Sequence, residues 1–192
     1  VQGAPRIVKP LIGAVDGAPL RRGDLAEWRR LAATMDSVLL AQGQGPIYVL
    51  ASSTTINSSD LLSVNRSLGE HYITPGFVRY SAEIDRRDGF PAELLKAKYV
   101  MAADPVQLDF DPAEQQIIAA PERELLEGSG IAGAFQKLPY EFVLDGGVKV
   151  YIFQKVRNFT DLEIHYLSDE LRKAHPDRAY IYLPPQDDKR SM

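Results

Sequence analysis

Hydrophobic and polar residues alternate along the chain in a way that predicts helices separated by short buried strands. Apolar residues recur at steps of three and four between Leu25 and Leu39, which predicts one apolar face of a helix. Asp24 stands just before this helix and Glu27 three residues later, the spacing of a capping box. Trp28 lies on the same apolar stripe, so we expect it in the core rather than at a membrane or partner surface.

Two short apolar runs, at 47–51 and 99–103, predict buried strands. Short helices are predicted around 60–68 and from Pro91 onward, because proline suits the first turn of a helix. Residues 71–79 predict an extended piece that the Pro75-Gly76 pair interrupts. Residues 112–127 predict a helix that Pro121 breaks or kinks.

The last third of the chain carries the strongest local signals. Asp145-Gly146-Gly147 stands between the apolar runs 140–144 and 148–154, which predicts an antiparallel hairpin. The second of these runs is apolar at consecutive positions, so we expect it to be a central strand. Thr160 with Glu163 predicts a second capped helix, and residues 180–183 predict a final edge strand.

Together these elements predict the α/β class, arranged as a three-layer Rossmann-like sandwich. Strands separated by helices favour a mostly parallel sheet with right-handed crossovers, to which the C-terminal antiparallel hairpin would add a margin. We expect residues 1–23 to form a linker or lead-in, residues 24–185 a single α/β domain, and residues 186–192 a polar tail.

Composition narrows the classes of partner. The chain has 192 residues and a net charge of -4, which argues against nucleic acid because that partner needs a basic face. No apolar stretch approaches the roughly 18 to 20 residues that cross a bilayer. The absence of cysteine rules out disulfides and thiolate chemistry.

The end of the first predicted strand is the best candidate for a binding site. Ser52, Ser53 and Asn57 follow that strand, and Asp104 and Gln107 follow the second. In open α/β sheets ligands bind outside the carboxyl ends of the strands, so these five side chains are expected to converge on one rim. Hydroxyls beside a helix N-terminus would suit a phosphate or carboxylate. The alternative, which the residue types favour, is that Ser52, Ser53 and Asn57 cap the next helix and complete a turn.

Several other chemistries lack their signatures. There is no Gly-x-Gly-x-x-Gly and no P-loop, so we expect no dinucleotide cofactor, and a methyltransferase is disfavoured. No Gly-x-Ser-x-Gly elbow surrounds a serine, and no catalytic residue is assigned. His71, His165 and His175 are too far apart for a metal site. The charged run at 85–88 could grip an anionic or sugar ligand, but a solvated loop with local ion pairs is favoured.

A resemblance to a known family rests on several short segments. These are Tyr48-Val49-Leu50-Ala51-Ser52-Ser53 with Asn57, Asp85-Arg86-Arg87-Asp88-Gly89-Phe90-Pro91, Tyr99-Val100, Asp104-Pro105-Val106-Gln107, and Phe135, Leu138 and Phe142 with the Asp145-Gly146-Gly147 hairpin. With these segments, residues 45–183 resemble the C-terminal soluble domain of bacterial multi-spanning membrane glycosyltransferases similar to polyprenyl- or dolichyl-phosphate-mannose protein mannosyltransferases.

The resemblance implies a non-catalytic accessory domain on the extracytoplasmic, periplasmic side of a bacterial membrane. Its partner would be the membrane-embedded remainder of the parent protein, with a glycan or lipid-linked sugar as a candidate ligand. In such enzymes the catalytic acidic residue lies in a loop between the first membrane helices, and this sequence has no counterpart to it. The alternative is a free-standing α/β hydrolase or transferase with its site at the strand ends.

Overall fold

The computed structural model describes residues 23–67, 73–79 and 81–183. Nearly all of the predicted lead-in, the whole predicted polar tail and the first two residues of the extended piece predicted at 71–79 lie outside the described residues.

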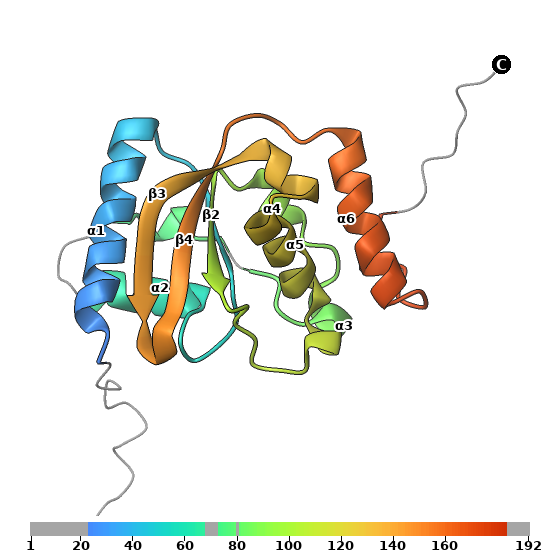
Figure 1. Ribbon diagram of the computed structural model, residues 1–192, viewed down its shortest axis with the longest axis horizontal. Coiled ribbons are helices and arrows are strands. Elements are labelled where there is room, and N and C mark those ends of the chain that lie inside the picture. The colour runs from blue at the N-terminus through green and yellow to red at the C-terminus, as the bar shows by residue number, and fades with distance from the viewer. Residues whose placement is uncertain (1–22, 68–72, 80, 184–192) are drawn as a thin grey trace, which may run out of the picture.

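The described strands form a four-stranded open sheet in the spatial order β1-β2-β4-β3 (Figure 1). Their bounds are β1 (Ile47–Leu50), β2 (Tyr99–Asp104), β3 (Phe135–Leu144) and β4 (Val148–Lys155). β1 and β2 are parallel, whereas β2–β4 and β4–β3 are antiparallel. The α/β class is therefore confirmed, but the prediction of a mostly parallel, Rossmann-like sheet is wrong, because two of the three strand pairs are antiparallel.

The place of the hairpin explains this difference. The hairpin itself is confirmed, but β4 lies between β3 and β2 instead of extending one margin of a parallel sheet. β4 is buried on both faces, with Val150 and Ile152 in one core cluster and Tyr151 and Phe153 in the other. A strand that is apolar on both faces belongs in the middle of a sheet, as the sequence predicted for β4. β3 instead lies at one edge of the sheet, opposite β1, and its register shifts between Lys137 and Glu141.

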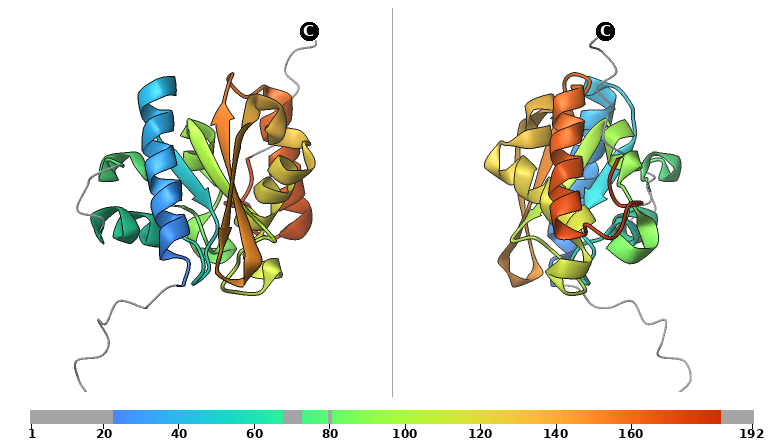
Figure 2. Two further views of the ribbon diagram at one scale, coloured as in Figure 1. Left: turned by 60° about the vertical axis from the view of Figure 1, so that its left-hand side comes forward. Right: turned by 90° about the vertical axis from the view of Figure 1, so that its right-hand side faces the viewer.

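Helices cover both faces of this sheet (Figure 2). The described helices are α1 (Leu25–Gln42), α2 (Ser58–Ser67), α3 (Asp85–Asp88), α4 (Ala92–Lys96), α5 (Gln116–Glu127) and α6 (Asp161–Ala174). Short 3-10 turns lie at η1 (Pro75–Phe77), η2 (Pro112–Glu114), η3 (Gly130–Ala134) and η4 (Asp145–Gly147). One apolar cluster packs α1 and α2 against the sheet, and a second packs α4, α5 and α6 against the other face. Trp28 is fully buried in the first cluster, as predicted.

The two predicted capping boxes have different outcomes. Thr160 and Glu163 form the predicted box at the start of α6. At the start of α1 the Asp24 side chain makes no capping hydrogen bond and instead accepts one from the N–H of Asp145 at 2.9 Å. Glu27 accepts a hydrogen bond from the N–H of Val143 at 3.0 Å. The box predicted for α1 is wrong because tertiary contacts with the β3–β4 hairpin take both carboxylates.

Two further predictions differ from the structure at least in part. α5 continues through Pro121, so the predicted break does not occur there, although the missing N–H of proline removes one helical hydrogen bond. Residues 180–183 form no strand. Ile181 is instead buried in the second core cluster, and the carbonyl of Tyr180 accepts a hydrogen bond from the N–H of Phe90 at 3.1 Å. Of the extended piece at 71–79, Val78 makes a single parallel bridge to Ile47.

Candidate functional site

Three of the five predicted rim residues meet at the carboxyl ends of β1 and β2. The N–H of Ser52 donates to the carbonyl of Gln107 at 2.9 Å. The hydroxyl of Ser53 donates to Oε1 of Gln107 at 3.0 Å and accepts from the N–H of Thr55 and of Ile56. Ser52, Ser53 and Gln107 therefore converge as predicted, and Gln107 accepts hydrogen bonds from both serines. Whether they bind a ligand stays a prediction.

Asn57 and Asp104 take other roles. The Asn57 carbonyl oxygen accepts a hydrogen bond from the N–H of Asp60 at 2.8 Å, and its amide donates to the carbonyl of Ser53 at 2.9 Å. Asn57 thus caps α2, the alternative that its residue type favoured. Asp104 is exposed at the end of β2, in register with Lys149 of β4. Within the described part of the chain, its side chain joins none of the hydrogen bonds of the cluster.

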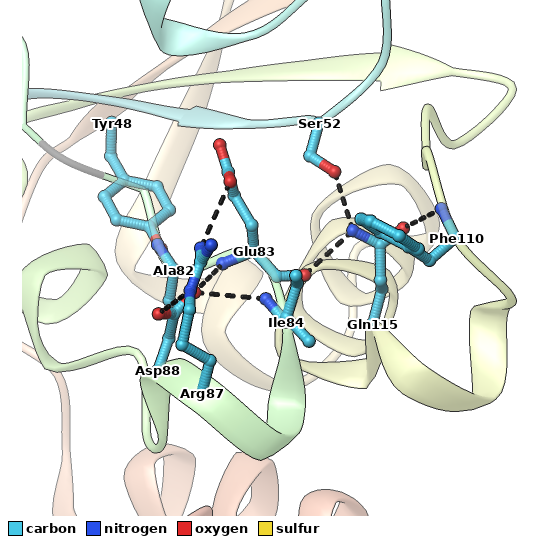
Figure 3. A network of polar contacts seen from close by, with 9 residues as sticks. All are labelled: Tyr48, Ser52, Ala82, Glu83, Ile84, Arg87, Asp88, Phe110 and Gln115. Carbon is cyan, nitrogen blue, oxygen red and sulfur yellow. Dashed lines mark hydrogen bonds and ion pairs between the residues drawn. The ribbon is translucent and has the colours of Figure 1, made fainter.

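Gln115, which the sequence did not single out, connects the rim to the neighbouring segment. Its buried amide donates to the hydroxyl of Ser52 at 2.6 Å and to the carbonyl of Glu83 at 2.8 Å. Its oxygen accepts from the N–H of Phe110 at 2.8 Å. Figure 3 shows Gln115 between these three partners. Ser52 thus has an amide as its partner, and no imidazole or carboxylate of the described residues contacts its hydroxyl, whereas a serine nucleophile needs such a base.

Glu122 is a second residue that the sequence did not reveal. This carboxyl group on α5 is fully buried, and one oxygen accepts a hydrogen bond from the N–H of Ala103 at 2.6 Å. β1 has already ended opposite this point of β2, so Glu122 supplies the acceptor that a continuing strand would have provided. Burial raises the pKa of Glu122 well above its usual range. The hydrogen bond from Ala103 lowers this pKa, but its effect is smaller than that of burial.

The charged run at 85–88 is only partly solvated. It forms the short helix α3, and Asp85 within it is fully buried. Its carboxylate accepts hydrogen bonds from the N–H groups of Gln116 and Ile117, both at 2.9 Å, at the start of α5. His175, which follows α6, lies with Nε2 at 2.6 Å from the same carboxylate. The favoured interpretation of a solvated loop is therefore wrong for Asp85, which joins three helices.

A cavity of about 300 Å³ opens beside this network, between β1, α3 and the start of α4. The fully buried Tyr48 lies at its base, and Arg87, Asp88, Phe90, Pro91 and Glu93 are among the other lining residues. Its lining includes part of the segment at 85–91 on which the family resemblance rests. None of the five predicted rim residues lines it.

A second cavity of about 440 Å³ lies between the loop after β2 and the outer side of α5. Its walls are mostly apolar, from Val106, Leu108, Ala119 and Leu126, with Arg123 at its edge. This cavity also lies apart from Ser52 and Ser53, which are almost completely buried. The strand-end cluster is thus a closed hydrogen-bonded junction, and the open space lies to either side of it.

Comparison of the chain with models of protein families found no match, and comparisons with curated proteins and with solved structures found none either. No helix within the described residues is both long enough and apolar enough to cross a membrane. Across the same part of the chain, no three or more His, Asp or Glu side chains gather as a metal-binding group. The site must therefore be interpreted from its own geometry.

Proposed function

We infer that this chain is a non-catalytic accessory domain of an integral-membrane glycosyltransferase. It would lie on the extracytoplasmic, periplasmic side of a bacterial membrane, against the membrane-embedded remainder of the parent protein. There it would position an acceptor, a glycan or a partner protein. The basis for the parent class is the resemblance of the segments at 45–183.

One observation carries the non-catalytic part of the proposal. The polar groups at the strand ends are hydrogen-bonded to one another, and the hydroxyls of Ser52 and Ser53 are bonded to amides rather than to a base. A nucleophile without a general base is a weak one at neutral pH. This arrangement supports binding and structural roles for the strand ends more than bond-making chemistry.

The first test is the reading frame that encodes the chain. We expect the codons upstream of Val1 to specify several apolar segments of about 20 residues each, the length that crosses a bilayer. A complete upstream frame without such segments would overturn the proposed parentage. This result does not depend on any ligand.

The second test addresses catalysis directly. The purified chain, incubated with a lipid-linked sugar donor and an acceptor, is expected to transfer no sugar, whereas the full-length protein in the same assay is expected to do so. Transfer by the isolated chain would overturn the non-catalytic role.

One observation favours a free-standing α/β enzyme as a second candidate. Glu122 is a buried carboxyl group with a raised pKa near the carboxyl ends of β1 and β2, and such groups often act as acids or bases. A screen of the chain for hydrolase and transferase activity tests this candidate. It requires an activity that Glu122→Gln abolishes and that Glu127→Gln, the same change at an exposed position of α5, leaves intact.

A further inference from the structure

The base of the 300 Å³ cavity carries a hydrogen-bond donor that has no acceptor in the described part of the chain. The Tyr48 hydroxyl oxygen accepts a hydrogen bond from the N–H of Ala82 at 2.9 Å, but its proton is donated to no group among those residues. Burial raises the pKa of this phenol, so it keeps its proton at neutral pH. A buried hydroxyl at the base of a cavity is a polar group to which a ligand can hydrogen-bond.

An ion-pair network beside Tyr48 contains carboxylate oxygens that can accept further hydrogen bonds. Arg87 holds both oxygens of Asp88, at 2.5 and 2.7 Å, and one oxygen of Glu83 at 3.2 Å. Oδ2 of Asp88 also accepts the N–H groups of Glu83 and Ile84 (Figure 3). Among the residues that the structure describes, Oδ1 accepts only from Arg87. A carboxylate can accept about four hydrogen bonds, so Oδ1 keeps room for a hydroxyl of a ligand.

Charge around the cavity disfavours an anion. Glu83, Asp88 and Glu93 carry three negative charges, against three positive charges on Arg87, on Lys96, which pairs with Glu93 at 2.6 Å, and on Arg79, which also acts on Glu93. These formal charges balance, but all three carboxylates act on the Tyr48 hydroxyl at the cavity and would repel a phosphate or carboxylate there. A neutral ligand that both donates and accepts hydrogen bonds meets no such penalty.

The remaining walls and the size narrow the ligand class further. Phe90 and Pro91 add apolar side chains to the lining beside the polar groups. A volume of about 300 Å³ stands at the lower limit for small-molecule sites, which suits a single ring rather than a chain of them. A ring with hydroxyls at its edge and C–H groups on its face is a sugar.

We propose that this cavity binds one neutral sugar ring, with adjacent hydroxyls held by Asp88 and Tyr48 and its apolar face against Phe90. This proposal rests on the proposed function, because it names the ligand class that an accessory domain of a glycosyltransferase would position. The cavity belongs to the chain itself, however, and its binding can be measured without the membrane-embedded partner.

The test is an NMR titration of the isotope-labelled chain with methyl glycosides of mannose, glucose and galactose. We expect at least one of them to shift the backbone amide signals of Ala82, Arg87, Asp88 and Phe90 in a saturable way. Tyr48→Phe is expected to weaken that binding by about fivefold to tenfold, the effect of one lost hydrogen bond. Glu93→Gln tests a second carboxylate of the lining and is also expected to weaken the binding.

Matched controls separate recognition from stability. Tyr99→Phe removes another buried tyrosine hydroxyl, which donates to the carbonyl of Gly43 at 2.7 Å. Tyr99 belongs to the other apolar cluster and does not line this cavity, so this change should leave sugar binding unchanged. Glu127→Gln is the matched control for Glu93→Gln, because Glu127 lines the other cavity, and it should also leave sugar binding unchanged. Absence of saturable shifts with every glycoside, or equal weakening in the control variants, would overturn the proposal.

Inorganic phosphate provides the remaining test. If phosphate shifts these amides in place of the sugars, the charge argument fails and the proposed ligand class is overturned. This result does not decide the proposed function, because the upstream reading frame can encode membrane spans whether or not this cavity binds a sugar.

Discussion

Glu122 and Glu124 are two buried carboxyl groups on one helix, and each satisfies only one of its oxygens. Glu122 accepts the N–H of Ala103, and Glu124 accepts the N–H of Ile131 at 2.7 Å. Their second oxygens have no hydrogen-bond partner within the described residues. A Cβ at Gly130, where φ is positive, would collide with the Glu124 carboxylate, so a glycine suits the point where the chain passes it. When one oxygen of a buried carboxyl group has no hydrogen-bond donor, the neutral form of the group has a lower free energy than the charged form.

Glu124 should therefore make the protein more stable in mild acid. Burial raises its pKa from 4.5 to about 7, and the charge of Glu170 adds to this, against the hydrogen bond from Ile131. Between these pH values the folded protein holds a proton that the unfolded chain has released, so stability falls as the pH rises through this window. The free energy of unfolding should fall by on the order of 3 kcal/mol between pH 4.5 and 7.5, and Glu124→Gln should abolish this fall. Urea unfolding across this range measures it.

A control for this prediction is Glu127→Gln, the same chemical change at an exposed position of α5. It should leave the pH dependence of the free energy of unfolding as it is in the unmodified protein. If Glu124→Gln has the same pH dependence as the unmodified protein, Glu124 does not hold its proton in the folded state and the prediction is wrong.

At the scale of single residues, the sequence located part of the site. Ser52, Ser53 and Gln107 could be placed together because strand ends and small polar residues are local signals. Gln115 and Glu122 could not, since nothing near either residue in the chain marks it as a partner of β1 or β2. Asp85 was assigned to a loop because its neighbours are charged, whereas its partners lie 31 and 90 residues further on.

At the scale of elements, the start of α5 depends on a carboxylate from another part of the chain. Asp85 accepts two of the N–H groups that every helix leaves unsatisfied at its first turn, and it contacts His175 beyond α6. Negative charge at this end of a helix is also favoured by the helix dipole. The contact between α3, α5 and α6 thus rests on one buried side chain.

Asp85→Ala should cost about 3 kcal/mol of stability, because it leaves the N–H groups of Gln116 and Ile117 and the imidazole of His175 without their acceptor. Asp111→Ala is the matched control, since Asp111 caps the exposed turn η2 through the N–H of Ala113 and should cost about 1 kcal/mol or less. Urea unfolding gives both values. Equal costs for the two variants would show that Asp85 contributes no more than an ordinary surface cap.

The elements themselves could largely be predicted, but their pairing could not. The two early strands, the hairpin and the capped helix α6 follow from apolar runs, a turn signal and the Thr160–Glu163 spacing. The choice of β2 as the partner of β4 depends on which strands are buried on both faces and on how the crossover helices pack. Those are properties of the assembled sheet, so a chain that alternates helices and strands still folds with a mostly antiparallel sheet.

At the scale of the whole molecule, the sheet divides into a covered centre and an open margin. β2 and β4 each have a strand on either side and an apolar cluster on both faces. β3 has a neighbour only on one side, and its pairing is irregular between Lys137 and Glu141. Both apolar clusters include residues of β2 and β4, so loss of either strand from the structure would expose both clusters.

Amide hydrogen exchange should therefore be slowest in β2 and β4. Their hydrogen-bonded N–H groups are expected to exchange only through global unfolding, because no local opening frees them without separating both apolar clusters. The outward N–H groups of β3 should exchange much faster, since an edge strand with a bulge can open alone. Exchange measured by NMR with increasing urea distinguishes the two modes, because global unfolding responds steeply to denaturant and local opening does not. A shallow response in β2 would mean that the helices on one face separate from the sheet without the others, which would contradict a single cooperative core.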